Sequence, residues 1–163
     1  MFNKFKANDF FKLLASILLC QGAGFIGSFF TRSSVSTWYP TLNRPSFTPP
    51  SWIFAPVWMV LYVLMGVSLF LVWRKASPEH RVKSALGVFG IQLALNTVWS
   101  LLFFGLRSPL AGLADIILLW VAILLTIIRF DRIARLAGTL LIPYILWVSF
   151  AAILNASIVA LNP

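Results

Sequence analysis

The chain has 163 residues, of which 60% are hydrophobic and only 17 are charged, 13 Lys or Arg and 4 Asp or Glu. About a quarter of the residues of a soluble domain are charged, so this composition excludes a disordered or collagen-like chain and argues against a water-soluble domain. We therefore expect lipid as the solvent and one helical membrane domain that fills residues 1–163.

Five segments are long and apolar enough to cross a bilayer, which takes about 20 residues in a helix. They span residues 13–30, 54–73, 85–106, 109–128 and 136–161, and the only charged residue inside them is Asp115. The short connections that follow the second, third and fourth segments force neighbouring helices to run antiparallel. The sequence predicts an all-α membrane protein, a bundle of five transmembrane helices, with Pro143 kinking the last one.

The first segment contains Gly22-Ala-Gly24-Phe-Ile-Gly27, which matches the G-x-G-x-x-G pattern of dinucleotide-binding proteins. That pattern holds a pyrophosphate only where a strand turns into a helix. Within an apolar helix, small residues instead let a second helix approach closely. We therefore predict helix packing at these glycines.

The connection between the first two segments, residues 31–53, is the long one. Four prolines stiffen its backbone, and four aromatic side chains provide apolar surface that the loop can bury. A long ordered loop in a compact domain is usually functional. We expect it to lie as a lid over one end of the bundle; the residues concerned are Pro40, Pro45, Pro49 and Pro50 with Trp38, Tyr39, Phe47 and Trp52.

The basic residues are unevenly distributed between the two ends of the predicted bundle. One end receives ten of them, including Lys4, Lys6 and Lys12, and the other receives Arg32, Arg44 and Arg107. In a bacterial-type inner membrane, this asymmetry predicts a cytoplasmic N-terminus and an external C-terminus. The charges are dispersed at helix edges and form no continuous basic face, so we do not expect nucleic acid as a partner.

The residues needed for metal or hydrolytic chemistry are nearly absent from the sequence. His80 lies in a charged loop and Cys20 in the first helix, so the sequence predicts no metal site and no Ser-His-Asp arrangement. Asp115 has no paired base, which argues against an ion relay. No catalytic residue is identified with conviction.

Aromatic and amide side chains recur on one face of several predicted helices. Polar groups in hydrocarbon are costly unless paired, so they are expected to face the bundle interior. Measured from the helix ends at 1.5 Å per residue, four of them lie roughly 6–11 Å inside the boundary below the loop. A pocket with aromatic walls and a few polar groups suits a large, flat ligand. The set comprises Trp58, Tyr62 and Met65; Gln92, Asn96, Trp99 and Phe103; Asp115; and Tyr144, Trp147, Ala151 and Asn155.

An alternative interpretation needs no pocket. The tryptophans could anchor the helices at the membrane interfaces while the amides hold neighbouring helices together. The protein would then be a scaffold or a lipid-interacting protein without a specific ligand.

The chain resembles the TspO/MBR family of tryptophan-rich sensory proteins, which are related to the mitochondrial translocator protein. The stretch from Trp38-Tyr39 to Trp58 is similar to that family's W-Y-x-x-L-x-K-P-x-W-x-P-P-x-W segment with the Pro-x-Trp that follows it. Gln92 to Gly105, Asp115 and the Pro143–Asn155 segment resemble its third, fourth and fifth helices. Arg44 and Phe47 stand where the family usually has Lys and Trp, and the C-terminus lacks the Tyr and basic residue of the animal sterol-recognition segment.

The resemblance implies a protein, commonly dimeric, that binds porphyrins such as protoporphyrin IX and haem in a pocket covered by the first loop. No obligatory cofactor is implied; porphyrin is the ligand, and lipids are the surroundings. It acts as a sensor or transport-related regulator; the alternative is light- and oxygen-dependent porphyrin degradation through Trp58 and Trp147. With the resemblance, the predicted ligand-binding residues are Trp38, Trp52, Phe54, Trp58, Tyr62, Gln92, Asn96, Trp99, Phe103, Asp115, Tyr144, Trp147, Ala151, Leu154 and Asn155.

Overall fold

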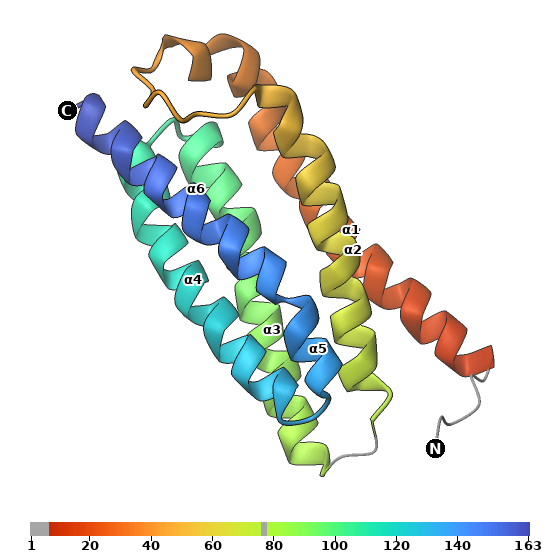
Figure 1. Ribbon diagram of the computed structural model, residues 1–163. Helices are drawn as coiled ribbons and strands as arrows, with labels where there is room; N and C mark the ends of the chain where they lie inside the picture. The colour runs from red at the N-terminus through yellow and green to blue at the C-terminus, as the bar shows by residue number, and fades with distance from the viewer. Residues whose placement is uncertain (1–6, 76–77) are drawn as a thin grey trace.

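A computed structural model describes residues 7–75 and 78–163, and every regular element within them is helical. Five helical spans are long and apolar enough to cross a membrane. They pack as an elongated bundle in which α1 begins at one end and α6 finishes at the other (Figure 1). The predicted class, an all-α bundle of five transmembrane helices, is confirmed. Its long helices are α1 (Ala7–Thr37), α2 (Phe54–Trp73), α3 (Glu79–Ser100), α4 (Pro109–Asp131) and α6 (Ile142–Leu161).

The first helix is longer than the expected segment 13–30. Residues 31–37 continue this helix. Their hydroxyl groups are accommodated because Thr31 and Thr37 donate hydrogen bonds to the carbonyls of Gly27 and Ser33, one turn earlier. Such bonds keep small polar residues compatible with a helix in lipid. The connection to α2 is correspondingly shorter than expected. At the other end of α1, Lys4 and Lys6, which entered the charge argument, lie outside the described residues.

The third and fifth spans are each built from two pieces. After Ser100, α3 continues as the π-helical turn η3 (Leu101–Gly105), in which the Leu106 N–H donates to the Leu101 carbonyl at 2.7 Å. The fifth span consists of α5 (Arg135–Leu140) and α6, and it breaks at Leu141. Pro143 was expected to kink the interior of one long helix. It occupies instead the first turn of α6, where its missing N–H leaves no hydrogen bond unmade.

Helices α1 and α2 approach each other at glycines. A Cβ atom added to Gly66 would lie 2.6 Å from the Ile17 Cα, and one added to Gly24 would overlap the Tyr62 ring. The expectation of close packing is therefore confirmed for Gly24. Around Gly22, by contrast, no atom lies within 4 Å of the corresponding position.

The connection between α1 and α2 covers the end of the bundle at which α6 finishes (Figure 1). It contains two short 3-10 turns, η1 (Tyr39–Thr41) and η2 (Ser51–Ile53). The Asn43 N–H donates to Asn162 Oδ1, and Asn162 Nδ2 donates to the Asn43 carbonyl, both at 2.9 Å. The ring of Phe47 also packs edge-on against Phe150 of α6. The loop is thus fastened to the C-terminal end of α6.

Replacing Gly66 with alanine should destabilise the protein by about 1–3 kcal/mol, because the new methyl group meets the Ile17 backbone, which has no rotamer by which to move away. Gly22→Ala is the matched control, since its methyl group meets open space. The free energy of unfolding in detergent measures both changes. Equal stability of the two variants would show that the α1–α2 contact is looser than described.

Candidate functional site

A cavity of about 730 Å³ lies in the half of the bundle that the loop covers. Its walls come from α1, α2, α3, η3 and α6, and Tyr39 and Ser51 of the loop close its end. This volume lies within the range of about 300–1,000 Å³ that is typical of small-molecule sites. The cavity therefore has room for a ligand of that size.

Ten of the fifteen residues predicted from the sequence line this cavity. They come from three spans, namely α2, α3 with its continuation η3, and α6, so the structure brings them together. The lining residues are Phe54, Trp58, Tyr62, Asn96, Trp99, Phe103, Trp147, Ala151, Leu154 and Asn155.

The other five lie elsewhere. Trp38 does not line the cavity, but it packs edge-on against the lining residue Phe103, with the ring centroids 5.7 Å apart. Trp52 is 72% exposed on η2. Gln92 and Tyr144 are buried below the cavity floor, and Asp115 is buried in α4. Binding by any of the fifteen residues stays a prediction.

A chain of hydrogen bonds fixes the floor of the cavity. The Tyr62 hydroxyl donates to Asn96 Oδ1 at 2.5 Å, Asn96 Nδ2 donates to the Tyr144 hydroxyl at 2.7 Å, and that hydroxyl donates to Gln92 Oε1 at 2.9 Å. The chain joins α2, α3 and α6. Because Asn96 is held from both sides, its carboxamide has a fixed orientation at the cavity wall.

The indole N–H groups of two lining tryptophans differ in their hydrogen bonding. Trp99 Nε1 donates to Asn155 Oδ1 at 3.2 Å, and Asn155 in turn donates to the Pro109 carbonyl. Trp147 Nε1 is buried and has no hydrogen-bond partner. Buried donors are nearly always paired with protein or water, so this N–H is available to an acceptor atom of water or of a bound molecule.

No residue of α1 is among the fifteen predicted ligand-binding residues. Small side chains recur at helical spacing and leave this face of the helix hollow, so that α1 forms one wall of the cavity. The pattern was present in the sequence but was interpreted only as helix packing. The α1 residues on this wall are Gln21, Gly24, Phe25, Gly27, Ser28, Thr31, Arg32 and Val35.

Two arginines at this end of the molecule lie at or near the cavity. Among the residues that the structure describes, Arg32 is the only charged one that lines the cavity. Arg44 lies outside it, with its guanidinium 5.2 Å from the centroid of the Tyr39 ring. Burial raises the pKa of the Tyr39 hydroxyl, and the charge and hydrogen bond of Arg44 only partly oppose that shift. Tyr39 is therefore neutral at physiological pH.

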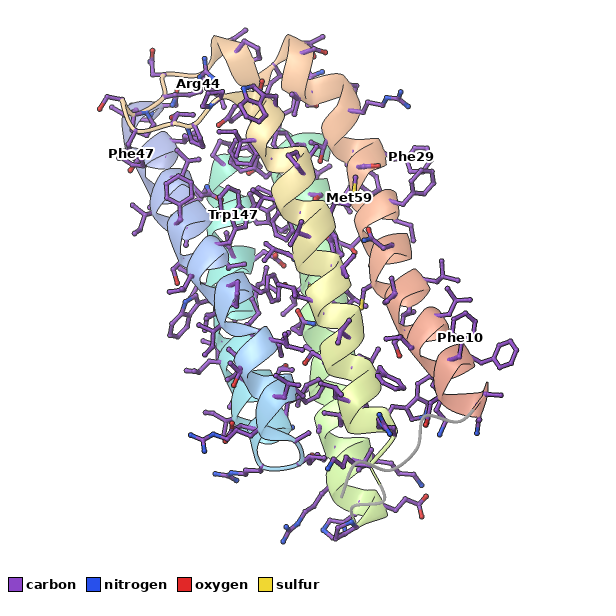
Figure 2. All side chains as sticks on the ribbon, turned by 45° about the vertical axis from the view of Figure 1, so that its right-hand side comes forward. Phe10, Phe29, Arg44, Phe47, Met59 and Trp147 are labelled. Atoms are coloured by element: carbon purple, nitrogen blue, oxygen red, sulfur yellow. The ribbon has the colours of Figure 1, made fainter. Side chains whose placement is uncertain are left out.

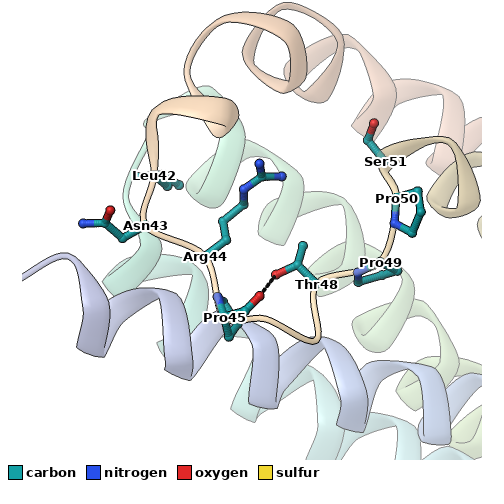
Figure 3. A pocket seen from close by; sticks show the side chains of 8 residues that line it. All are labelled: Leu42, Asn43, Arg44, Pro45, Thr48, Pro49, Pro50 and Ser51. Atoms are coloured by element: carbon teal, nitrogen blue, oxygen red, sulfur yellow. Dashed lines mark hydrogen bonds between the residues drawn. The ribbon is translucent and has the colours of Figure 1, made fainter.

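The loop has a second, shallower hollow of its own, shown in Figure 3. A turn in which the Thr48 hydroxyl donates to the Pro45 carbonyl at 2.7 Å shapes it. Its residues all belong to segment 42–51, and Ser51 borders both this hollow and the large cavity. The loop alone therefore separates the two spaces at this end.

Tyr144→Phe should lower the free energy of unfolding by about 1–3 kcal/mol, because it leaves a buried acceptor on Gln92 and a buried donor on Asn96 without partners. Tyr62→Phe removes a single hydrogen bond at the cavity edge and is the milder control. Denaturant titration in detergent compares the two variants. If Tyr144→Phe proves no worse than Tyr62→Phe, the hydrogen-bond chain does not organise the floor.

Comparison with known protein sequences identifies relatives of this chain. The sequence pattern of the TspO/MBR family matches residues 16–161. The chain is 48% identical to "Tryptophan-rich protein TspO" of Chlorobaculum tepidum over 151 residues, which are 93% of this chain and 96% of that protein.

More distant relatives carry other names. The chain is 37% identical to the "Translocator protein" of Homo sapiens over 80% of its own length and 78% of that protein. It is 34% identical to the "Tryptophan-rich sensory protein" of Cereibacter sphaeroides, with 77% of each chain covered.

Proposed function

Since this chain belongs to the TspO/MBR family of multi-pass membrane proteins, we propose that its cavity binds porphyrins, such as protoporphyrin IX or haem, or similar flat hydrophobic molecules. The protein would use that binding as a sensor or transport-related regulator of tetrapyrroles. The observation that carries this proposal is the cavity of about 730 Å³, walled by aromatic rings and bearing one unpaired indole donor.

The aromatic rings supply surfaces on which a flat macrocycle can stack. Trp58 lies on α2, Trp147 on α6, and Trp99 stacks on Phe103 with ring centroids 5.2 Å apart and planes tilted by 20°. Aromatic rings prefer offset-stacked or edge-to-face partners. A porphyrin in the cavity would therefore meet stacking partners on more than one helix.

Polar groups would fix the orientation of the ring system. Trp147 Nε1 would donate to an acceptor atom of the ligand, and Asn96 would offer the amide hydrogen that Tyr144 does not use. The guanidinium of Arg32 suits a propionate at the cavity edge. The residues that line the cavity include no histidine or cysteine, so the proposal rests on the macrocycle and its carboxylates rather than on iron ligation.

The membrane orientation belongs to the same proposal. The uneven distribution of basic residues favours a cytoplasmic N-terminus, and the loop and cavity would then lie toward the outer side of a bacterial-type inner membrane. Cysteines introduced in the loop and labelled from one side of intact cells would test this orientation.

A Trp58→Ala, Trp147→Ala double variant should bind protoporphyrin IX at least about tenfold more weakly, because each aromatic contact contributes about 0.5–1.5 kcal/mol beyond the area it buries. Fluorescence titration in detergent measures the affinity. The matched control is Trp73→Ala, Trp120→Ala, which also removes two indoles but at positions outside the cavity and outside the predicted site. Equal affinity in both double variants would remove the stacking role, and no saturable binding by the parent protein would end the proposal.

A second function is favoured by one observation: Trp58 and Trp147, two oxidisable indoles, line the same cavity. This function is porphyrin degradation driven by light and molecular oxygen. Illuminated in air, the parent protein should then give a defined bilin-like product, whereas Trp58→Phe and Trp147→Phe should retain binding and lose the product. Bleaching at the same rate in all three proteins, without a defined product, would leave binding as the function.

A further inference from the structure

The helices α1 and α2 are in close contact near the middle of their length. Gly24 packs directly on the Tyr62 ring, and Gly66 packs on the backbone of Ile17. At the same level, Gln21 Nε2 donates to the Met59 carbonyl at 3.1 Å. These contacts seal the lower limit of the cavity between the two helices.

Closer to the loop, the cavity reaches the surface between the same two helices. Among its lining residues, those from α3, η3 and α6 are buried or half-buried. Apart from Ser51 in the loop, the exposed ones all belong to α1 and α2. They are Phe25, which is 66% exposed, Met59, which is 61% exposed, and Ser28, Arg32 and Ala55.

Figure 2 shows Met59 between the two helices, whereas Phe29 points away from the bundle. Both helices are long and apolar enough to span the membrane. The gap that Met59 and Phe25 flank therefore faces lipid acyl chains and not water.

Arg32 stands at the rim of this opening. It is the only charged residue on the cavity wall, and the ion pairs found within residues 7–75 and 78–163 join Arg74 to Asp9 and Lys83 to Glu79, not Arg32 to a carboxylate. Arg32 is exposed and lies near the end of α1, where an arginine can reach toward the membrane interface. An acidic group of a ligand at the rim could form a charge-assisted hydrogen bond with it.

Entry on the side of the loop is blocked by contacts that the gap between α1 and α2 lacks. The paired Asn43–Asn162 hydrogen bonds and the Phe47–Phe150 contact hold the loop on α6. An entry path on that side requires these contacts to open, whereas the side chains of Phe25 and Met59 at the gap between α1 and α2 are exposed and make no such hydrogen bonds.

We propose that the ligand enters and leaves the cavity sideways from the lipid, through the opening between α1 and α2, and that Arg32 binds its carboxylate at the rim. The substrate class is thus an amphipathic acid already dissolved in the membrane leaflet next to the loop. This inference rests on the proposed binding function and adds the route by which the ligand reaches the site.

The first experiment separates passage from binding. Full-length protein in lipid nanodiscs receives protoporphyrin IX from donor vesicles, and association and dissociation are followed by fluorescence. Met59→Trp should slow both rates, about tenfold or more, and change the equilibrium affinity by less than about threefold, because an obstacle at an entrance acts on both directions of passage. Val60→Trp, an equally exposed neighbour outside the cavity, is the matched control and should leave both rates unchanged.

An Asn162→Ala variant, which removes the paired hydrogen bonds between the loop and α6, tests the competing route. Lateral entry predicts parent-like rates for it. Faster exchange in Asn162→Ala together with parent-like rates in Met59→Trp would overturn the inference and place entry under the loop. Absence of saturable binding in the parent protein would instead refute the proposed function itself, so the two failures are distinguishable.

The role of Arg32 is tested with two probes of the same shape. Arg32→Gln should weaken binding of protoporphyrin IX about tenfold, in the range of a lost charge-assisted hydrogen bond, and leave its neutral dimethyl ester unaffected. Arg107→Gln, at the same end but outside the cavity, should affect neither probe. Equal losses for the diacid and the diester would show that Arg32 does not bind the carboxylate.

Discussion

A carboxamide placed in hydrocarbon must find hydrogen-bond partners, and Asn96 finds them on two other helices. Tyr62 of α2 donates to it and Tyr144 of α6 accepts from it. Because an unpaired polar group in this environment is costly, these bonds fix α2, α3 and α6 at one level of the membrane. The rings of Trp58 and Trp147, on the same helices, are thereby set on the walls of a space that those helices do not fill.

That space exists because α1 brings little side-chain volume to it. Gly24 lets α1 lie directly on Tyr62, and the next turns place the small residues Gly27 and Thr31 on the cavity wall. A helix with leucines at these positions would fill the cavity. The same small residues leave the side of the cavity toward the lipid weakly closed, so the volume of the site and the proposed route into it have one cause.

Much of this arrangement could be predicted from the sequence, and the part that could not has a physical reason. The five spans follow from hydropathy, and the interior position of Asn96, Trp99 and Asn155 follows from the cost of burying polar groups without partners. Helical spacing, however, gives the face on which a residue lies and not its depth, so Gln92 and Tyr144 were grouped with the cavity although they lie beneath it. A glycine pattern is equally compatible with a packed helix and a hollow one, and only the position of α2 and α3 distinguishes them.

The central claim is that the cavity binds a flat ligand through the unpaired indole N–H of Trp147. The most direct test is the nitrogen–proton NMR spectrum of the indole groups with and without saturating protoporphyrin IX. A large change in the Trp147 N–H resonance is expected as this group gains an acceptor beside the macrocycle, with a smaller change for Trp99, whose N–H is already bonded to Asn155. An unchanged Trp147 resonance at saturation would contradict that claim.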